Sequence, residues 1–401
     1  MSTLAARFLD GISGFDGGLG LAVSGGGDSM AMLHLAAGTG ARVVTVDHGL
    51  RPEAAAEAAA VGQVCAGLGL RHDIVHWHWD QRGNLQDAAR RGRRALIADW
   101  ARRVGVQAVA LAHTRDDVAE TFVMRLARGA GVDGLAAMAA RWQEGGVTWL
   151  RPLLSATRAE LREYLLGIGG AWVEDPSNDN PRFDRVRVRK ALAVLAPLGI
   201  TAERLGEVAA HLAEARDALD AVTEAAARRV LHDLAGAVRF DAAWVGESAE
   251  VQRRLVLRVI ATIAPHDYGP RGPAVQALRE RLLAGKPGVL AGCRFVVQRG
   301  QLWACREARA VAGLVCDQGQ VWDGRWRLDG PKGAQVRALG AGLALCPDWR
   351  AVGVPRAALL ASPSLWLGDS LIAAPHAGFG TGYSANPLFP ATPLQVLGIT
   401  H

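Results

Sequence analysis

A glycine-rich segment between two serines is the first feature of this sequence that could do chemistry: Ser24, Gly25, Gly26, Gly27, Asp28 and Ser29. Glycine tolerates positive φ and lets the backbone approach a ligand closely. The N–H groups of such a turn, and of a helix that begins there, bind anions. The hydroxyls of Ser24 and Ser29 add donors, whereas Asp28 would repel bare phosphate and is expected to help hold a Mg²⁺ ion carried by a nucleotide. The segment therefore predicts a site for the phosphates of a nucleotide.

Other interpretations of this segment fit its residues less well. A Walker loop needs a lysine where Asp28 stands, and a dinucleotide fingerprint that starts at Gly25 needs a small residue where Met30 stands. A plain glycine-rich turn would explain one glycine more readily than three framed by two serines.

A second cluster of polar residues follows an apolar run: His113, Asp116, Asp117, Glu120 and Thr121. On a helix, His113, Asp117 and Thr121 are four residues apart and share one face, with Glu120 beside them. Capping of a helix by Thr114 and Asp116 is the structural alternative, because such residues favour helix N-termini. A cap explains one acid but not the group, and the single histidine argues against zinc. We therefore expect the cluster to take part in binding or catalysis.

Arginine-rich segments add positive charge. Arg90 and Arg93 lie one turn apart in a predicted helix, where they could stabilise a negative intermediate or only form a solvated face. A second segment alternates basic with apolar residues and, interpreted as extended chain, turns one charged edge outward: Arg182, Arg185, Arg187, Arg189 and Lys190. This edge predicts contact with an RNA backbone, although charged runs are often only solvated.

Apolar runs that alternate with helical stretches must position these residues. Strands are expected at 19–23, 42–46, 74–77, 106–112 and 149–154, with helices between them and at 157–167. This alternation predicts an α/β fold with a doubly wound parallel sheet. Ser24, Asp47 and His113 then follow the carboxyl ends of strands, which is where ligands bind in such sheets.

The rest of the chain predicts two further domains. The turn-rich segment 174–181 marks a boundary, and we expect a catalytic domain at 1–195. Apolar residues at helical spacing predict a mainly helical domain at 196–309, which ends in a hairpin around Arg299-Gly300. Short tryptophan-containing runs broken by glycine and proline predict a small, β-rich domain at 310–401.

Composition narrows the class of protein. The 401 residues carry a net charge of +6 and have a pI near 9.4, which suits a polyanionic partner. The sequence has neither the pattern of a secretory signal nor the ~18 consecutive apolar residues of a membrane span, so we expect a cytoplasmic protein. Its five cysteines are scattered without a C-x-x-C pair, which argues against zinc, iron–sulfur and redox chemistry.

The glycine-rich segment resembles the S-G-G-x-D-S loop of the N-type ATP pyrophosphatases, also called PP-loop ATPases, which split ATP between its α and β phosphates. Further motifs resemble those of the tRNA(Ile)-lysidine synthases in order and spacing: Asp47-His48-Gly49-Leu50-Arg51, Ala89-Arg90-x-x-Arg93, His113-Thr114-Arg115-Asp116-Asp117-x-x-Glu120-Thr121, Leu126-Ala127-Arg128-Gly129 and Glu174-Asp175-Pro176-Ser177-Asn178. The resemblance is dense over 19–190, thinner to 307 and loose beyond. Arg94 and Val186 depart from it, because the family usually has an aromatic residue and an asparagine there.

The resemblance implies a reaction. ATP adenylates the carbon-2 carbonyl of the wobble cytidine in a tRNA(Ile) with a CAU anticodon, and the ε-amine of free L-lysine then displaces AMP. ATP and Mg²⁺ would lie at Ser24–Ser29, and the implied catalytic residues are Asp28, Arg90, His113, Asp116, Asp117 and Glu120. The implied contacts of lysine and cytidine are Arg93, Asp117, Glu120 and Thr121. The basic segment and the two later domains would bind the tRNA.

Three other functions compete with this one. A PP-loop tRNA thiolase is the nearest, but such enzymes generally need a sulfur-carrying cysteine, and none lies near the loop. NAD and GMP synthetases act on small molecules and would leave the basic segment unexplained. A nucleotide-sensing module would have no need of the carboxylates. The sequence leaves open whether the chain is a monomer or a homodimer.

Overall fold

The computed structural model describes residues 3–15, 18–49, 53–78, 85–174, 182, 184–264 and 269–388, with the backbone alone for 85–91. The chain divides into two compact units, Met1–Arg216 and Asp217–His401. Each unit has its own buried core. The expected division into three domains stays a prediction. No helix within the described ranges is both long and apolar enough to cross a membrane.

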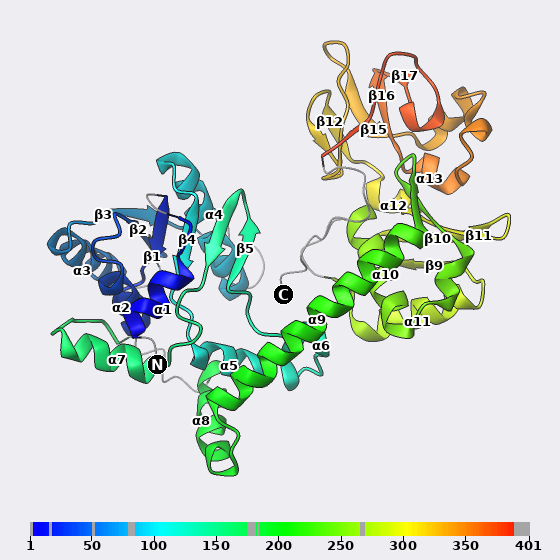
Figure 1. Cartoon of the computed structure of the whole chain (residues 1–401). Coiled ribbons are helices and arrows are strands. Elements are labelled where there is room, and N and C mark those ends of the chain that lie inside the picture. Colours follow the sequence, from blue (N-terminus) through cyan, green and yellow to red (C-terminus); the bar gives the residue numbers. More distant parts are fainter. Residues whose placement is uncertain are drawn as a thin grey trace. The chain divides into compact units, whose positions relative to one another are not determined.

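A six-stranded sheet forms the centre of the first unit (Figure 1). Its strands, in spatial order, are β3 (Arg71–His76), β2 (Arg42–Asp47), β1 (Leu19–Ala22), β4 (Ala108–Leu111), β6 (Val147–Leu150) and β5 (Arg141–Glu144). All neighbours are parallel except β5, which pairs antiparallel with β6. The four strands expected before His113 are confirmed, and the short edge strand β5 is the one that the sequence analysis missed.

Helices cover both faces of this sheet. Adjacent residues of a strand point to opposite faces, and Val43 and Val44 of β2 accordingly lie in two different cores. The core around Val43 is formed with α1 (Leu4–Gly11), α2 (Gly27–Leu35), α3 (Ala54–Gly67) and α7 (Arg158–Gly167). The core around Val44 is formed with α4 (Leu85–Val104). The doubly wound parallel sheet is therefore confirmed.

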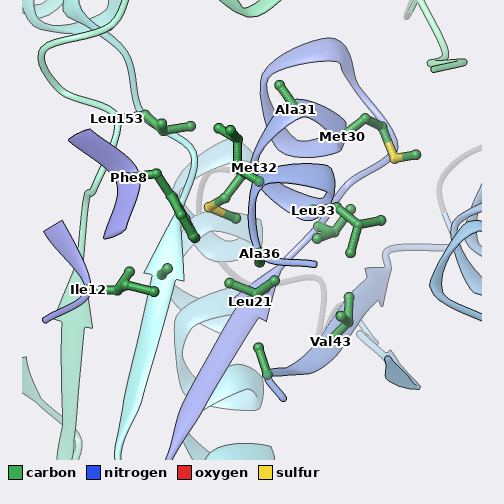
Figure 2. Packing of buried hydrophobic residues seen from close by; sticks show 14 of the residues in the cluster. Phe8, Ile12, Leu21, Met30, Ala31, Met32, Leu33, Ala36, Val43 and Leu153 are labelled. Atoms are coloured by element: carbon green, nitrogen blue, oxygen red, sulfur yellow. The ribbon is translucent and has the colours of Figure 1, made fainter. Parts of the chain in front are cut away.

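The core on the α2 face brings together residues that are distant in sequence. Figure 2 shows Phe8 of α1 beside Met32 of α2 and Leu153, which follows β6. On the other face, the indole of Trp100 in α4 lies against the central strand. A Cβ on Gly20 of β1 would lie 2.9 Å from that indole, so this position admits only glycine without a rearrangement.

Four further elements complete the first unit: α5 (Arg115–Leu126), α6 (Val132–Leu135), α8 (Asp184–Leu195) and the 3₁₀ turn Ala196–Leu198. The beginning of α9 (Ala202–Val230) packs on α5, where Val118 and Phe122 bury Ala209. The expectation of extended chain for 182–190 is wrong from Asp184 onward, because these residues form α8. Arginine, lysine, alanine and leucine favour helix, and burial of Val186 outweighs the alternating pattern of its neighbours.

The second unit begins with an antiparallel five-stranded sheet. Its strands, in spatial order, are β7 (Leu231–Leu234), β8 (Ala237–Phe240), β11 (Gln301–Arg306), β10 (Cys293–Gln298) and β9 (Gly288–Leu290). The 3₁₀ turn Ala242–Gly246, α10 (Ala249–Ile263) and α11 (Gly272–Leu283) accompany it. The hairpin around Arg299-Gly300 is confirmed, and both residues have the positive φ of a two-residue turn. The helices were expected, but most of the sheet was not.

The last part of the second unit is rich in short strands, as predicted. Its helical segments are α12 (Ala308–Val311), α13 (Arg356–Leu360) and the 3₁₀ turns Gly340–Leu345, Trp349–Val352 and Pro375–Ala377. Its strands are β12 (Val315–Asp317), β13 (Val321–Trp322), β14 (Trp326–Arg327), β15 (Gln335–Ala338), β16 (Pro363–Leu367), β17 (Ser370–Ala373) and β18 (Asn386–Pro387). They form sheets in the orders β12-β15-β16-β17 and β13-β14-β18.

Candidate active site

The glycine-rich loop connects the end of β1 to the beginning of α2. Gly25 has φ +86°, a conformation that side chains with a Cβ rarely adopt. The hydroxyl of Ser29 accepts a hydrogen bond from the backbone N–H of Ser24 at 3.2 Å and donates one to the carbonyl of Gly26 at 2.9 Å. Gly26 is the N-cap of α2 and has no side chain with which to cap it. The first N–H groups of α2 therefore point toward the position that an anion would occupy.

Trp172 and Val173, which the sequence analysis did not single out, lie beside this loop. The backbone N–H of Val173 donates to the carbonyl of Gly25 at 2.9 Å. A Cβ on Gly27 would lie 3.5 Å from the indole of Trp172, so this ring lies beside the start of α2. The indole N–H of Trp172 donates to Glu174 at 3.5 Å. Of the segment 174–181, which was expected to mark a domain boundary, residues 175–181 lie outside the described part of the chain.

Arg158, the first residue of α7, connects three of the predicted carboxylates. Its Nε donates to Asp28 at 3.2 Å, its Nη2 to Asp117 at 2.9 Å and its Nη1 to Glu120 at 2.8 Å. Its backbone N–H donates to Asp116 at 2.8 Å. One arginine thus gathers the acid of the loop and the three acids of α5. We name Asp28, Asp116, Asp117, Glu120 and Arg158 the carboxylate cluster.

Asp117 has both a structural contact and a contact in the site. Its Oδ2 accepts from the N–H and the hydroxyl of Thr114, which caps α5, while its Oδ1 faces Arg158. The capping alternative, which named Thr114 and Asp116, is correct for Thr114 and wrong for Asp116, because the capping partner of Thr114 is Asp117. This cap does not exclude Asp117 from the cluster. Burial acts to raise the pKa of Asp117, but Arg158 and the Thr114 N–H outweigh it and hold this pKa below its usual value.

Glu120 is the most deeply buried acid of the cluster, with 1% of its surface exposed. Its Oε1 accepts from Arg158 and, at 2.6 Å, from Nε of Arg189 in α8. Its Oε2 is buried and has no hydrogen-bond partner among the described residues. A buried carboxylate oxygen without a donor is costly, so this atom is ready to accept a hydrogen bond from a ligand.

Asp28 lies in the first turn of α2. Burial raises its pKa above the usual value, against the attraction of the Arg158 charge; the nearby Asp117 also raises it. A cation that approaches the loop would oppose both effects and favour the ionised carboxylate.

His113 precedes α5 and lies beside Arg151, a residue that the sequence analysis did not single out. Arg151 donates from Nε to Nδ1 of His113 at 3.1 Å, and its guanidinium lies 3.9 Å from the ring centroid of Trp142. Burial and the charge of Arg151 lower the pKa of His113 to about 3. The imidazole is therefore neutral at physiological pH.

The remaining predicted residues divide between this site and the surface. Arg185 and Arg189 turn inward, and Nη1 of Arg185 lies 3.8 Å from Asp117. Arg187 is exposed and pairs with Asp184 on its own helix. Three other predicted residues are exposed, namely Arg93, Arg182 and Lys190. Thr121 is half-buried, and the side chain of Arg90 lies outside the described residues.

Comparison with known proteins places this geometry in context. A family model described as a PP-loop domain matches residues 9–195. The chain is 51% identical to the tRNA(Ile)-lysidine synthase of Ruegeria pomeroyi, over 92% of this chain and 90% of the relative. It is 43% identical to that of Rhodopseudomonas palustris, over 65% and 79%, and 40% identical to that of Zymomonas mobilis, over 73% and 88%.

Proposed function

Because the chain belongs to the tRNA(Ile)-lysidine synthase family, we propose that it ligates L-lysine to carbon 2 of the wobble cytidine in the CAU anticodon of tRNA(Ile), at the cost of one ATP. The observation that carries this proposal is the carboxylate cluster beside the glycine-rich loop. In this cluster, Asp28 of the loop and the buried Asp117 and Glu120 of α5 each accept a hydrogen bond from a different nitrogen of the Arg158 guanidinium.

The first half of the reaction uses the loop. The carbonyl oxygen of cytidine attacks the α-phosphorus of ATP, and the bond to pyrophosphate breaks. The N–H groups at the start of α2 and the hydroxyl of Ser24 stabilise the charge that develops on the leaving pyrophosphate. Asp116 and the imidazole of His113, which is neutral, position the cytidine at the end of β4.

The residues present fit a Mg²⁺ ion that arrives with ATP rather than a resident metal. Among the described residues, no group of three or more His, Cys, Asp or Glu could hold a metal ion. Magnesium, however, usually binds one or two carboxylates together with substrate phosphates. Asp28 is the carboxylate placed for this, and the ion would neutralise phosphate charge.

The second half of the reaction requires an uncharged amine. The ε-amine of lysine has a pKa near ~10.4 and must lose a proton before it attacks. Asp117 and Glu120 accept this proton and orient the amine, and the buried Oε2 of Glu120, which has no hydrogen-bond partner among the described residues, has acceptor capacity left for it. The new carbon–nitrogen bond forms as the bond from carbon 2 to the oxygen of AMP breaks.

Recognition of tRNA uses exposed basic residues just before and within α8, namely Arg182, Arg187 and Lys190. They contact phosphates on both sides of the anticodon loop, whose single-stranded bases can be turned out of the stack. The residues beyond α8, expected as domains at 196–309 and 310–401, bind the body of the tRNA. A tRNA substrate also supports a cytoplasmic location.

Sulfur transfer, the reaction of the thiolase alternative, lacks a suitable thiol. Cys65 is fully buried in the core of the first unit, and burial raises its pKa to about 11. The other cysteines lie in the second unit and are buried or half-buried. A sulfur carrier needs an accessible thiolate, which these positions do not provide.

Incorporation of radiolabelled lysine into a tRNA(Ile) transcript with a CAU anticodon tests the proposal. Label should appear only with ATP, with one AMP and one pyrophosphate released per lysine. A transcript with a GAU anticodon is the matched control. Folded protein that transfers no lysine would refute the proposal. Sedimentation of the same sample distinguishes a monomer from a homodimer.

A further inference from the structure

Arg158 contacts three carboxylates, although the proposed function gives this arginine no role of its own. Each of its three guanidinium nitrogens contacts a different carboxylate, those of Asp28, Asp117 and Glu120. The side chain is 22% exposed, whereas those of Asp117 and Glu120 are 9% and 1% exposed. The contacts join two helices, because Asp28 belongs to α2 and the other two acids belong to α5.

The start of α7 holds Arg158 firmly in place. Thr157 caps this helix in a reciprocal pair with Glu160, whose side chain also pairs with Arg7 of α1 at 2.6 Å. The backbone N–H of Arg158 donates to Asp116 at 2.8 Å. The guanidinium therefore projects from a backbone that is tied to both α1 and α5.

We propose that Arg158 is a positioning residue that couples the two halves of the reaction, by fixing the loop acid Asp28 relative to the amine-binding acids Asp117 and Glu120. This inference rests on the proposed function. Adenylation depends on where Asp28 lies, and amine transfer depends on where Glu120 lies. One guanidinium sets both positions.

The physical reason lies in the geometry of the guanidinium. Three carboxylates facing one another repel, and Arg158 supplies a shared opposite charge at their centre. Its planar fork directs each N–H to one acid, whereas the ammonium of a lysine is a single point on a flexible stem. A cation without the fork would still reduce the repulsion between the acids, but only the fork holds all three in fixed directions.

Arg158→Lys separates geometry from charge. Pyrophosphate release without lysine measures the first half-reaction, and labelled lysine transfer measures the second. We expect both rates to fall by about 10- to 100-fold, as when a metal-binding side chain loses the partner that orients it, and the KM for lysine to rise. Affinity for tRNA and the unfolding temperature should stay near those of the wild type. The matched control is Arg162→Lys, on the same helix, where an exposed arginine contacts the single acid Glu174.

Chemical rescue keeps the inference testable if Arg158→Ala is poorly active or unstable. Guanidinium at low millimolar concentration should restore part of both rates to this variant, and methylammonium should not. The inference is overturned if Arg158→Lys loses only stability while both rates per folded molecule stay unchanged. It is also overturned if only one half-reaction falls. Wild-type protein that transfers no lysine would instead refute the proposed function.

Discussion

Nε of Arg151 lies 3.1 Å from Nδ1 of His113 and donates a hydrogen bond to it. A guanidinium has only donors, so Nδ1 of His113 must accept and the proton of the neutral ring must lie on Nε2. Burial and the charge of Arg151 lower the pKa of this histidine to about 3. His113 thus offers a single N–H donor to the site and cannot act as a cationic acid at neutral pH.

This relationship predicts the behaviour of His113 in solution. In ¹⁵N spectra of histidine-labelled protein, its ring should remain the neutral Nε2–H tautomer from pH 8 to pH 5, because its pKa lies below that range. Comparison with the spectrum of His113→Gln assigns the signal. A ring that titrates near pH 6.5 would contradict the prediction, and Arg151→Met should move the pKa in that direction.

Arg187 and Arg189 should differ although both belong to the basic segment. Arg187 is exposed, so Arg187→Gln should weaken tRNA binding a few-fold and lower the slope of log K against log salt by about 1. Arg189 contacts Glu120, so Arg189→Gln should lower kcat. Filter binding from low to high salt, beside lysine transfer at saturating tRNA, separates the two effects. The control is Arg103→Gln, which changes an exposed residue of α4. Equal effects of Arg187→Gln and Arg189→Gln on tRNA binding would refute the separate roles of Arg187 and Arg189.

Gly25→Ala should impair use of ATP beyond its effect on stability. The φ of +86° costs an alanine about 1–2 kcal/mol, and relief of this strain would move the N–H groups of the loop. Gly38 has φ +81° in a turn where no atom lies within 4 Å of the position that a Cβ would take, so Gly38→Ala imposes similar strain away from the site. Both variants should unfold at a lower temperature, but only Gly25→Ala should raise the KM for ATP. Equal KM values would show that the loop tolerates a side chain.

His376 should make the second unit less stable in acid. Its ring contacts Trp326 at 4.6 Å between centroids, and burial, with the charge of Arg325, lowers its pKa from 6.5 to about 4. As the pH falls through 6.5, the unfolded chain binds a proton that the folded protein refuses, so stability declines until about pH 4. The loss is on the order of 2–3 kcal/mol.

Urea unfolding of His376→Gln from pH 7.5 to 4.5 measures this contribution. The variant should lose less stability over that range than the wild type does, whatever its stability at pH 7.5. His232→Gln, at an exposed position of β7, should behave as the wild type does. Parallel curves for the wild type and His376→Gln would contradict the assignment.

The sequence predicted the parts of the site that depend on local pattern. The apolar run indicated the strand Leu19–Ala22, and the glycines indicated the helix start at Gly27–Leu35. The hydroxyl of Ser29 accepts a hydrogen bond within the loop, from the N–H of Ser24. Strand ends that meet at one edge of a parallel sheet brought Ser24 and His113 to the same side of the fold, as expected. These features follow from short-range rules.

The missed residues depend on contacts that local pattern does not encode. Arg158 is 130 positions from Asp28 in sequence, and only the packing of α7 against α2 brings the two together. Thr157 indicated the start of a helix, but nothing in its neighbours showed where that helix would point. The same holds for α8, where Val186 and Val188 indicated extended chain although burial on α5 favours a helix.

The two oxygens of Asp117 have consequences for how this enzyme can evolve. One oxygen holds the first turn of α5, and the other faces Arg158. Asparagine would offer a single acceptor, and glutamate would carry its carboxylate one methylene too far from Thr114. A substitution of Asp117 that served a new nucleophile would also remove a hydrogen bond that stabilises the N-terminus of α5. Changes in substrate preference are therefore expected at partly exposed positions beside the cluster, such as Thr121.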